Sequence, residues 1–153
     1  GFDIVPYRED IKQADARALP LDAEIADFVF IDSPYSDNIK YNEHPENIGN
    51  ISCEDPIFFE ELEKVAKEIY RILKPHKYVA WLIGDQAKRG NFTPVGYILY
   101  GILIKHFKPI DWICITRHNQ TSNTSVWHYR AQKYNFFLRG FKHLLIMQKI
   151  TKK

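Results

Sequence analysis

Hydrophobic positions along this chain form two kinds of pattern. Residues 27–31 and 78–83 are almost unbroken apolar runs, which are typical of strands buried on both faces of a parallel sheet. Between these runs, apolar residues over 56–73 recur every three or four positions and predict a helix with one buried face. Pro56 suits the first turn of that helix, and Lys74-Pro75 ends it. Alternation of such strands and helices predicts an α/β fold.

Shorter runs predict the other elements of this fold. Strands are expected at residues 1–5, 11–14, 110–116 and 141–149. Thr93-Pro94 is expected to cap a helix that runs to about His106. The polar residues 41–52 form either a simple connector or a lid over a bound ligand. The length of 153 residues predicts one domain, spanning residues 1–153.

Composition narrows the choice of function only slightly. The net charge of +2 is too small to argue for nucleic-acid binding by itself. No apolar run reaches the ~18 residues of a membrane span, and the amino terminus does not resemble a signal peptide. Cys53 and Cys114 lie far apart without a metal-type spacing, so we expect a reducing, cytoplasmic setting and no membrane partner.

The candidate chemistry lies directly after the apolar run at 27–31. There Asp32-Ser33-Pro34-Tyr35 supplies a carboxylate, backbone carbonyls and an aromatic ring. Pro34 cannot donate a ladder hydrogen bond and also restricts the backbone of Ser33, so the strand must end here. Open α/β sheets bind ligands at the carboxyl ends of their strands, and we therefore expect a functional loop at this place.

These four residues resemble the Asp/Asn/Ser-Pro-Pro-Tyr/Phe/Trp signature of S-adenosylmethionine-dependent amino-methyltransferases, which methylate adenine N6 or cytosine N4 in DNA. Ser33 departs from the signature, which has proline at that position. The resemblance covers nearly the whole chain and implies a Rossmann-like α/β methyltransferase sheet, mostly parallel, with an antiparallel hairpin at its carboxyl-terminal end. It also implies DNA binding and a place in restriction–modification. Aspartate at the first position of the signature favours adenine N6 as the target.

The resemblance implies that Asp32, Ser33, Pro34 and Tyr35 are the catalytic residues. The Asp32 carboxylate and the backbone carbonyl of Ser33 would each accept one hydrogen of the target amine, which frees the nitrogen lone pair. Tyr35 would stack on the target base after the base has flipped out of the duplex. Neither a metal nor a covalent enzyme intermediate is required.

The resemblance also implies a binding site for S-adenosylmethionine. Asp3 would bind the ribose, Asp15 and Ala16 would border the adenine, and Asp32 would lie beside the methyl group. The alternative for Asp3 and Asp15 is that they are turn acids, which are common wherever strands end.

Residues 118–140 are expected to form a target-recognition segment. Cations alternate with aromatic rings here, which suits phosphates and stacked bases respectively. Including two positions outside this segment, the residues expected to contact DNA are Asn38, Arg117, Trp127, Tyr129, Arg130, Lys133 and Arg139. The alternative is an ordinary amphipathic segment whose rings join the core.

One feature of the family is absent from the sequence. The seven glycines never form the Gly-x-Gly loop that binds the methionine part of the cofactor. The strand before such a loop would lie between those at 2–5 and 27–31, so we expect the first central strand to be missing and sheet edges to be open. An upstream segment, a complementing chain or a second copy of this chain would then be a partner, besides DNA.

Four alternatives to adenine methylation remain open on the sequence alone. The chain could methylate cytosine N4 or a base in structured RNA. It could instead be an inactive subunit that binds nucleic acid or a partner protein, for which Ser33 and the absent glycine loop both argue. It could also be an unrelated nucleotide-binding domain in which Asp32 to Tyr35 are a chance turn.

Overall fold

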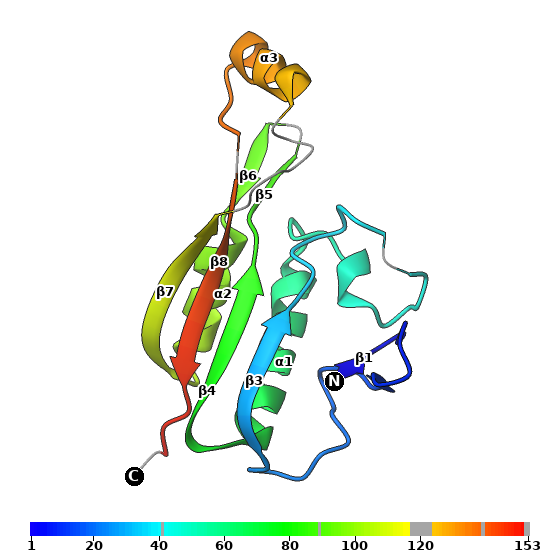
Figure 1. The fold of residues 1–153 in the computed structure, drawn as a ribbon, viewed down its shortest axis with the longest axis vertical. Helices are drawn as coiled ribbons and strands as arrows, with labels where there is room; N and C mark the ends of the chain where they lie inside the picture. Colours follow the sequence, from blue (N-terminus) through cyan, green and yellow to red (C-terminus); the bar gives the residue numbers. More distant parts are fainter. Residues whose placement is uncertain (41, 89, 117–123, 139, 152–153) are drawn as a thin grey trace.

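The computed structural model describes residues 1–40, 42–88, 90–116, 124–138 and 140–151. Its elements are β1 (Phe2–Asp3), β2 (Lys12–Gln13), β3 (Ala26–Asp32), η1 (Ile48–Asn50), α1 (Pro56–Ile72), β4 (Leu73–Ile83), β5 (Gln86–Lys88), β6 (Asn91–Thr93), α2 (Val95–Leu103), β7 (Lys108–Thr116), α3 (Ser125–Tyr134) and β8 (Phe141–Gln148). Figure 1 shows the sheet β3-β4-β8-β7 with α1 and α2 behind it.

The four-stranded sheet is mixed. β3 pairs with β4 in parallel, whereas β8 is antiparallel to both of its neighbours, β4 and β7. The predicted antiparallel pairing of the closing strand is therefore confirmed. The prediction of a mostly parallel sheet holds only in part, because the chain inserts β8 between two strands that run in the same direction.

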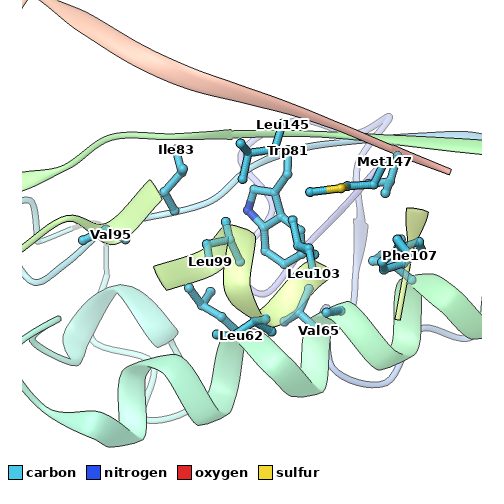
Figure 2. Close-up of a cluster of buried hydrophobic side chains, with 14 of the residues drawn as sticks. Leu62, Val65, Trp81, Ile83, Val95, Leu99, Leu103, Phe107, Leu145 and Met147 are labelled. Atoms are coloured by element: carbon cyan, nitrogen blue, oxygen red, sulfur yellow. The ribbon is translucent and has the colours of Figure 1, made fainter. Parts of the chain in front are cut away.

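One face of this sheet carries the hydrophobic core. Helix α1 turns an apolar stripe toward the sheet, as its periodicity predicts, and Asp55 caps its first turn by accepting from the Ile57 amide. The ring of Trp81 is fully buried near Leu99 and Leu103 of α2, in the middle of this layer (Figure 2). The core therefore fixes β4, the strand beside β3, most firmly.

The other face of β3 has large exposed side chains. Phe28 and Phe30 are 57% and 58% exposed, although they alternate with Val29 and Ile31, which pack against the core. Within the described part of the chain, β3 is an edge strand, and β1 and β2 form a separate parallel pair. An unpaired edge beside exposed aromatic rings is a natural place for another strand to bind.

Helix α2 is capped differently from the sequence prediction. Pro94 precedes its first residue without a side-chain cap, and Asp85, after β4, instead accepts from the Gly96 amide at 3.0 Å through Oδ1. The other Asp85 oxygen lies 3.0 Å from Nε2 of His143 on β8. Nδ1 of the same ring accepts from the indole of Trp112 on β7 at 2.9 Å. This chain of bonds ties the start of α2 to the sheet.

The elements η1, β5, β6 and α3 were not predicted. Residues 86–93, where no element was predicted, contain the short antiparallel hairpin of β5 and β6. Helix α3 stands apart at the far end of the molecule in Figure 1, and none of its ten residues, all of which the structure describes, is buried. Among the described helices, none is long and apolar enough to cross a membrane.

Candidate active site

The residues Asp32 to Tyr35 form the signature loop. This loop lies at the carboxyl end of β3, as predicted from the sequence. Asp32 is the last residue of β3 and pairs with Leu82 of β4. Its side chain is 52% exposed, and Oδ1 lies 3.0 Å from Nζ of Lys142 on β8. The carboxylate is thus accessible from outside and held by an ion pair that crosses the sheet.

Ser33 turns toward the core instead of the solvent. The indole Nε1 of Trp81 donates to Ser33 Oγ at 2.9 Å. Trp81 pairs with Ile31 in the register of β3 and β4, so its ring and the Ser33 side chain lie on the helix-covered face. The Ser33 hydroxyl is therefore directed at the core, and its backbone carbonyl is a second acceptor in the same loop.

The next two residues each pack against a glycine. A Cβ on Gly49 would lie 3.2 Å from Cβ of Pro34, and a Cβ on Gly84 would lie 3.4 Å from the Tyr35 ring. Gly49 belongs to the turn η1 within residues 42–52, so the backbone of this turn rests directly on Pro34. The signature loop is therefore held by η1 and by the end of β4.

A cavity of about 470 Å³ opens beside the loop, within the range of small-molecule sites. Its lining includes Asp3 of β1, Asp15 and Ala16, and Asp32 to Pro34 of the signature loop. Side chains of α1, among them Leu62 and Val65, make its apolar wall. All four residues predicted to bind the cofactor thus meet in one cavity. Of the signature residues, Asp32, Ser33 and Pro34 line it, whereas Tyr35 packs outside it against Gly84.

Two of the acids that line the cavity, Asp3 and Asp15, differ in how many hydrogen bonds their carboxylates already accept within the protein. Oδ1 of Asp3 accepts from the Val5 amide at 2.9 Å, and a carboxylate has capacity for further bonds at its second oxygen. Asp15 accepts bonds from Arg17 on both of its oxygens. Its carboxylate is therefore largely engaged within the protein.

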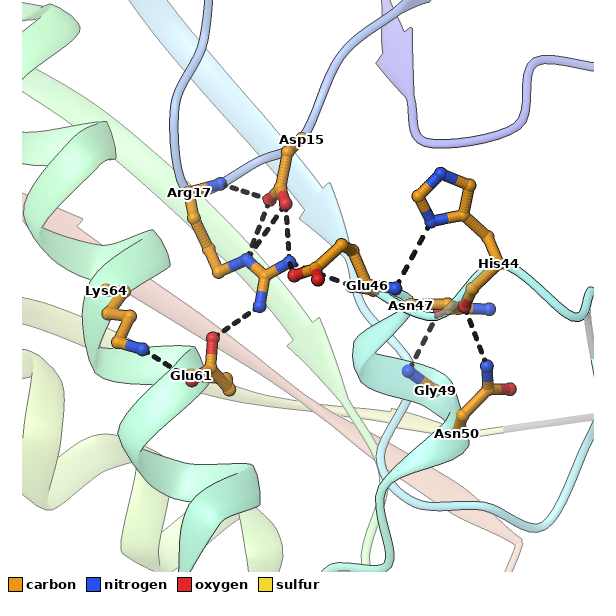
Figure 3. Close-up of polar contacts among 9 residues, drawn as sticks. All are labelled: Asp15, Arg17, His44, Glu46, Asn47, Gly49, Asn50, Glu61 and Lys64. Atoms are coloured by element: carbon orange, nitrogen blue, oxygen red, sulfur yellow. Dashed lines mark hydrogen bonds and ion pairs between the residues drawn. The ribbon is translucent and has the colours of Figure 1, made fainter.

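Arg17 connects three segments around the cavity (Figure 3). Besides Asp15, its guanidinium donates to Glu46 just before η1 at 2.9 Å and to Glu61 on α1. Burial acts to raise the pKa of Asp15, but the hydrogen bonds and charge of Arg17 outweigh it and hold that pKa below its usual value. Hydrogen bonds from Lys64 and Arg17 likewise lower the pKa of Glu61, and the bond to Asp15 raises the pKa of Arg17.

Arg17→Met is expected to lower the free energy of unfolding by about 2 kcal/mol at neutral pH, because it removes charged hydrogen bonds from partly buried carboxylates. The lowered pKa values of Asp15 and Glu61 mean that their contribution is complete above their unfolded pKa values of about 4 and is lost as pH falls through the folded values. Denaturant unfolding of the wild type and the variant from pH 7 down to pH 3 should therefore show the two stabilities converging.

Arg8→Met is the matched control for this experiment. Arg8 pairs with Asp10, and both side chains are largely exposed. The change should cost about 0.5 kcal/mol or less, as exposed pairs generally do. If Arg17→Met lowered the free energy of unfolding no more than Arg8→Met does, the stabilising role of the Arg17 hydrogen bonds would be contradicted.

Helix α3 carries most of the residues expected to contact DNA. The Arg130 guanidinium lies 5.2 Å from the Trp127 ring centroid, and Lys133 Nζ lies 5.8 Å from that of Tyr129. These side chains are exposed, so the alternative that the rings join the core is wrong for this helix. Asn38, also exposed, follows the signature loop, whereas Arg117 and Arg139 lie outside the described residues.

Sequence reasoning missed the residues that hold the loop. Trp81 and Lys142 were assigned only to strands, and Gly84 only to a strand end. The available signals were a tryptophan, which needs a partner for its N–H when buried, and a lysine at the start of an otherwise apolar strand. Neither signal identifies Ser33 or Asp32 as the partner.

Comparison with known proteins gives one family and several related folds. The model of the N6/N4 methyltransferase family, described as DNA methylase, matches residues 26–152. No curated protein matches the sequence.

Among solved structures, one similar fold is a protein of Thermus thermophilus, named provisionally as a DNA modification methylase and solved with S-adenosyl-L-methionine. It is 21% identical with a TM-score of 0.59, and the match covers 91% of this chain and 54% of that one. A SAM-dependent methyltransferase of Methanosarcina mazei is 14% identical, with a TM-score of 0.54 and coverage of 93% and 68%. The N-methyltransferase NodS of Bradyrhizobium japonicum is 11% identical, with a TM-score of 0.54 and coverage of 97% and 64%. The chain thus spans about half the length of the Thermus protein, and these likenesses concern the fold.

Proposed function

Since this chain belongs to the family of S-adenosylmethionine-dependent N6/N4 DNA methylases, we propose that it transfers a methyl group to the exocyclic amino group of adenine in DNA. The observation that carries the proposal is the position of the signature loop. Asp32, Ser33 and Pro34 line a cavity of about 470 Å³, and the Asp32 carboxylate is half exposed at its border. The choice of adenine rests on aspartate at the first position of the signature.

The residues present fit the ribose and the sulfonium of such a cofactor, whereas these 153 residues contain no Gly-x-Gly loop for its methionine part. Carboxylates of Asp3 and Asp32 lie on the polar side of the cavity, where they can accept hydrogen bonds from hydroxyl groups or balance a positive charge. The turn at Asp15 and Ala16 borders the same space, with its acid already bound to Arg17. When bound here, S-adenosylmethionine supplies a methyl group made electrophilic by the attached sulfonium.

The role of the signature loop is to raise the nucleophilicity of the amine. An exocyclic nitrogen of a base is a poor nucleophile because its lone pair is delocalised into the ring. We propose that the Asp32 carboxylate accepts one of its hydrogens and the Ser33 carbonyl the other, which favours a tetrahedral nitrogen. Acceptors already fixed in place need no reorganisation during the reaction, which is the main electrostatic advantage of an enzyme site.

Tyr35 is proposed to stack on the target base once it has left the duplex. Its ring is half-buried and lies over the Gly84 backbone, where a larger residue would crowd it. Outside the cofactor cavity but next to its border, this ring can contact a base that enters from the opposite side. The cavity and Tyr35 would then hold methyl donor and acceptor on either side of Asp32.

Helix α3 is proposed to contact DNA. Its rings and cations are exposed together, as a surface for phosphates and bases requires. Replacing Arg130 and Lys133 by alanine should weaken DNA binding and lower the slope of log Kd against log salt concentration by about 2, one for each phosphate that is no longer neutralised. Fluorescence anisotropy with labelled duplex DNA between low and moderate salt measures both quantities.

The matched control replaces Lys67 and Lys105 by alanine. Both ammonium groups pair with Glu63 instead of lying among exposed rings. This double variant removes the same amount of positive charge and should keep the salt slope of the wild type. Equal slopes for both double variants would contradict the DNA contact of α3.

A further strand is proposed to pair with β3. The edge of β3 and the exposed Phe28 and Phe30 rings face the side on which the pair β1 and β2 lies, with the cavity between. A strand paired to this edge would occupy the part of the cavity between β3 and the β1–β2 pair, and would leave the part at Asp3, Asp15 and Asp32 to the cofactor. It could come from another segment of the polypeptide, from a complementing chain or from a second copy, and analytical ultracentrifugation of the intact protein distinguishes a monomer from the latter two.

The function is tested by methyl transfer from labelled S-adenosylmethionine to unmethylated duplex DNA, using the intact polypeptide that contains these residues. Mass spectrometry of the digested nucleosides should show N6-methyladenine. Finding N4-methylcytosine would overturn the base assignment, and label in RNA alone would overturn DNA as substrate. DNA binding without any transfer would show an inactive subunit.

A further inference from the structure

The hydrogen bond between Trp81 and Ser33 joins the rigid centre of the core to the signature loop. Trp81 is fully buried, and its ring lies close to Leu99 and Leu103 (Figure 2). Its N–H donates to Ser33 Oγ at 2.9 Å, across a separation of 48 residues. The buried Trp81 ring therefore restrains Ser33 of the signature loop through this hydrogen bond.

The buried indole N–H of Trp81 requires a hydrogen-bond acceptor. An indole N–H can only donate, and when it is buried without an acceptor it incurs the full cost of lost hydration. The hydroxyl of Ser33 is the acceptor that the structure provides. Serine has a freer backbone than proline, so a side-chain anchor restores at Ser33 some of the rigidity that a pyrrolidine ring would give.

The anchor acts next to the atoms that are proposed to do the chemistry. Ser33 follows Asp32 directly, and their side chains point to opposite faces of the sheet because β3 alternates. The backbone carbonyl of Ser33 belongs to the peptide bond between Ser33 and Pro34. Gly49 of η1 packs against Pro34 and restrains that end of the peptide group. Fixing the Ser33 side chain thus limits rotation of the peptide group that contains this carbonyl.

We propose that Trp81 is a positioning residue for methyl transfer: its indole N–H anchors Ser33 and thereby orients the Ser33 carbonyl beside the Asp32 carboxylate. This inference rests on the function proposed above. Trp81 lines the inner wall of the cavity through its ring, yet its effect on the reaction passes through Ser33. Loss of the anchor should lower the rate of the chemical step more than it weakens cofactor binding.

A double-mutant cycle tests the proposal. Trp81→Phe removes the donor and keeps an aromatic ring, Ser33→Ala removes the acceptor, and the third variant carries both changes. Each single variant should lower kcat about tenfold, because small misplacements of reacting groups have effects of this size or larger. The double variant should be no slower than the slower single variant, since both remove the same bond. Because both residues line the cavity, the Kd for S-adenosylmethionine can rise as well, but by a smaller factor than kcat falls.

Trp112→Phe is the matched control, because it removes an indole bond to His143 that does not reach the signature loop. It should keep the kcat of the wild type. Losses that multiply in the Trp81→Phe, Ser33→Ala double variant, or an unchanged kcat in Ser33→Ala, would overturn the proposal. Ser33→Ala leaves the core ring in place and gives this answer even if Trp81→Phe does not fold.

Backbone order separates failure of this inference from failure of the proposed function. NMR order parameters of the Ser33, Tyr35 and Ser36 amides should fall in Trp81→Phe and Ser33→Ala, and not in Trp112→Phe. A wild-type protein without methyl transfer would remove the proposed function, while these order parameters would still report whether Trp81 holds the loop. Unchanged order in both loop variants would overturn the anchor itself.

Discussion

Asp32→Ala is expected to abolish methyl transfer in practice, with kcat falling about 100- to 1,000-fold, the range seen when one preorganised polar group is removed from a transition state. The variant retains the Ser33 carbonyl but loses the carboxylate that is proposed to accept a hydrogen of the target amine. Its free energy of unfolding should change little, since Asp32 is half exposed and its ion pair with Lys142 borders solvent. Initial rates of transfer to duplex DNA, together with thermal unfolding, measure both effects.

Asp27→Ala is the matched control for Asp32→Ala. Asp27 lies near the other end of β3, is also exposed, and pairs with Lys74 and Lys77. Losing it removes a carboxylate and an exposed ion pair from the same strand without touching the cavity. Asp27→Ala should transfer methyl groups like the wild type. Transfer by Asp32→Ala at the rate of the control would exclude the catalytic assignment.

Gly96→Ala is expected to destabilise the fold by about 3 kcal/mol, through overpacking and loss of buried hydrogen bonds. A Cβ there would lie only 2.2 Å from Cδ2 of His143. The imidazole cannot swing aside cheaply, because Asp85 holds Nε2 and Trp112 donates to Nδ1. For a chain of this length, the melting temperature should fall by about 6–12 °C, which differential scanning calorimetry records directly.

Gly101→Ala provides the comparison within the same helix. No atom lies within 4 Å of a Cβ added to Gly101, so alanine fits there. Because alanine has a higher helix propensity than glycine, this variant should be as stable as the wild type or more stable by about 1 kcal/mol. Equal melting temperatures for Gly96→Ala and Gly101→Ala would contradict the expected steric clash between a Cβ at residue 96 and the His143 ring.

The sequence predicted well those elements whose signal is local. The apolar runs at 27–31 and 78–83 became β3 and β4, and periodicity with Pro56 identified α1. It failed where three-residue strands carry polar side chains, as in β5 and β6, and in α3, whose rings follow no single buried face. The secondary structure of such segments depends on tertiary contacts that the local sequence does not reveal.

In the candidate site, too, features with a local sequence signal were predicted and features that depend on distant contacts were missed. The signature loop was found because its four residues are consecutive, and Asp3 and Asp15 were identified only through the family resemblance, since acids are common wherever strands end. Its supporting contacts join residues far apart in sequence: 48 positions separate Ser33 from Trp81, and 110 separate Asp32 from Lys142. The cap of α2 by Asp85 was missed for this reason, since the nearer Thr93-Pro94 looked sufficient.

The burial of Trp81 gives the protein an internal optical reporter. Of the three tryptophans, Trp112 and Trp127 are each 40% exposed, whereas Trp81 is fully enclosed and its ring forms part of the cavity wall. Its emission should therefore lie at the blue end of the spectrum and respond when a molecule fills the neighbouring space. Occupancy of the cavity can then be followed by intrinsic fluorescence, without a label and independently of any turnover.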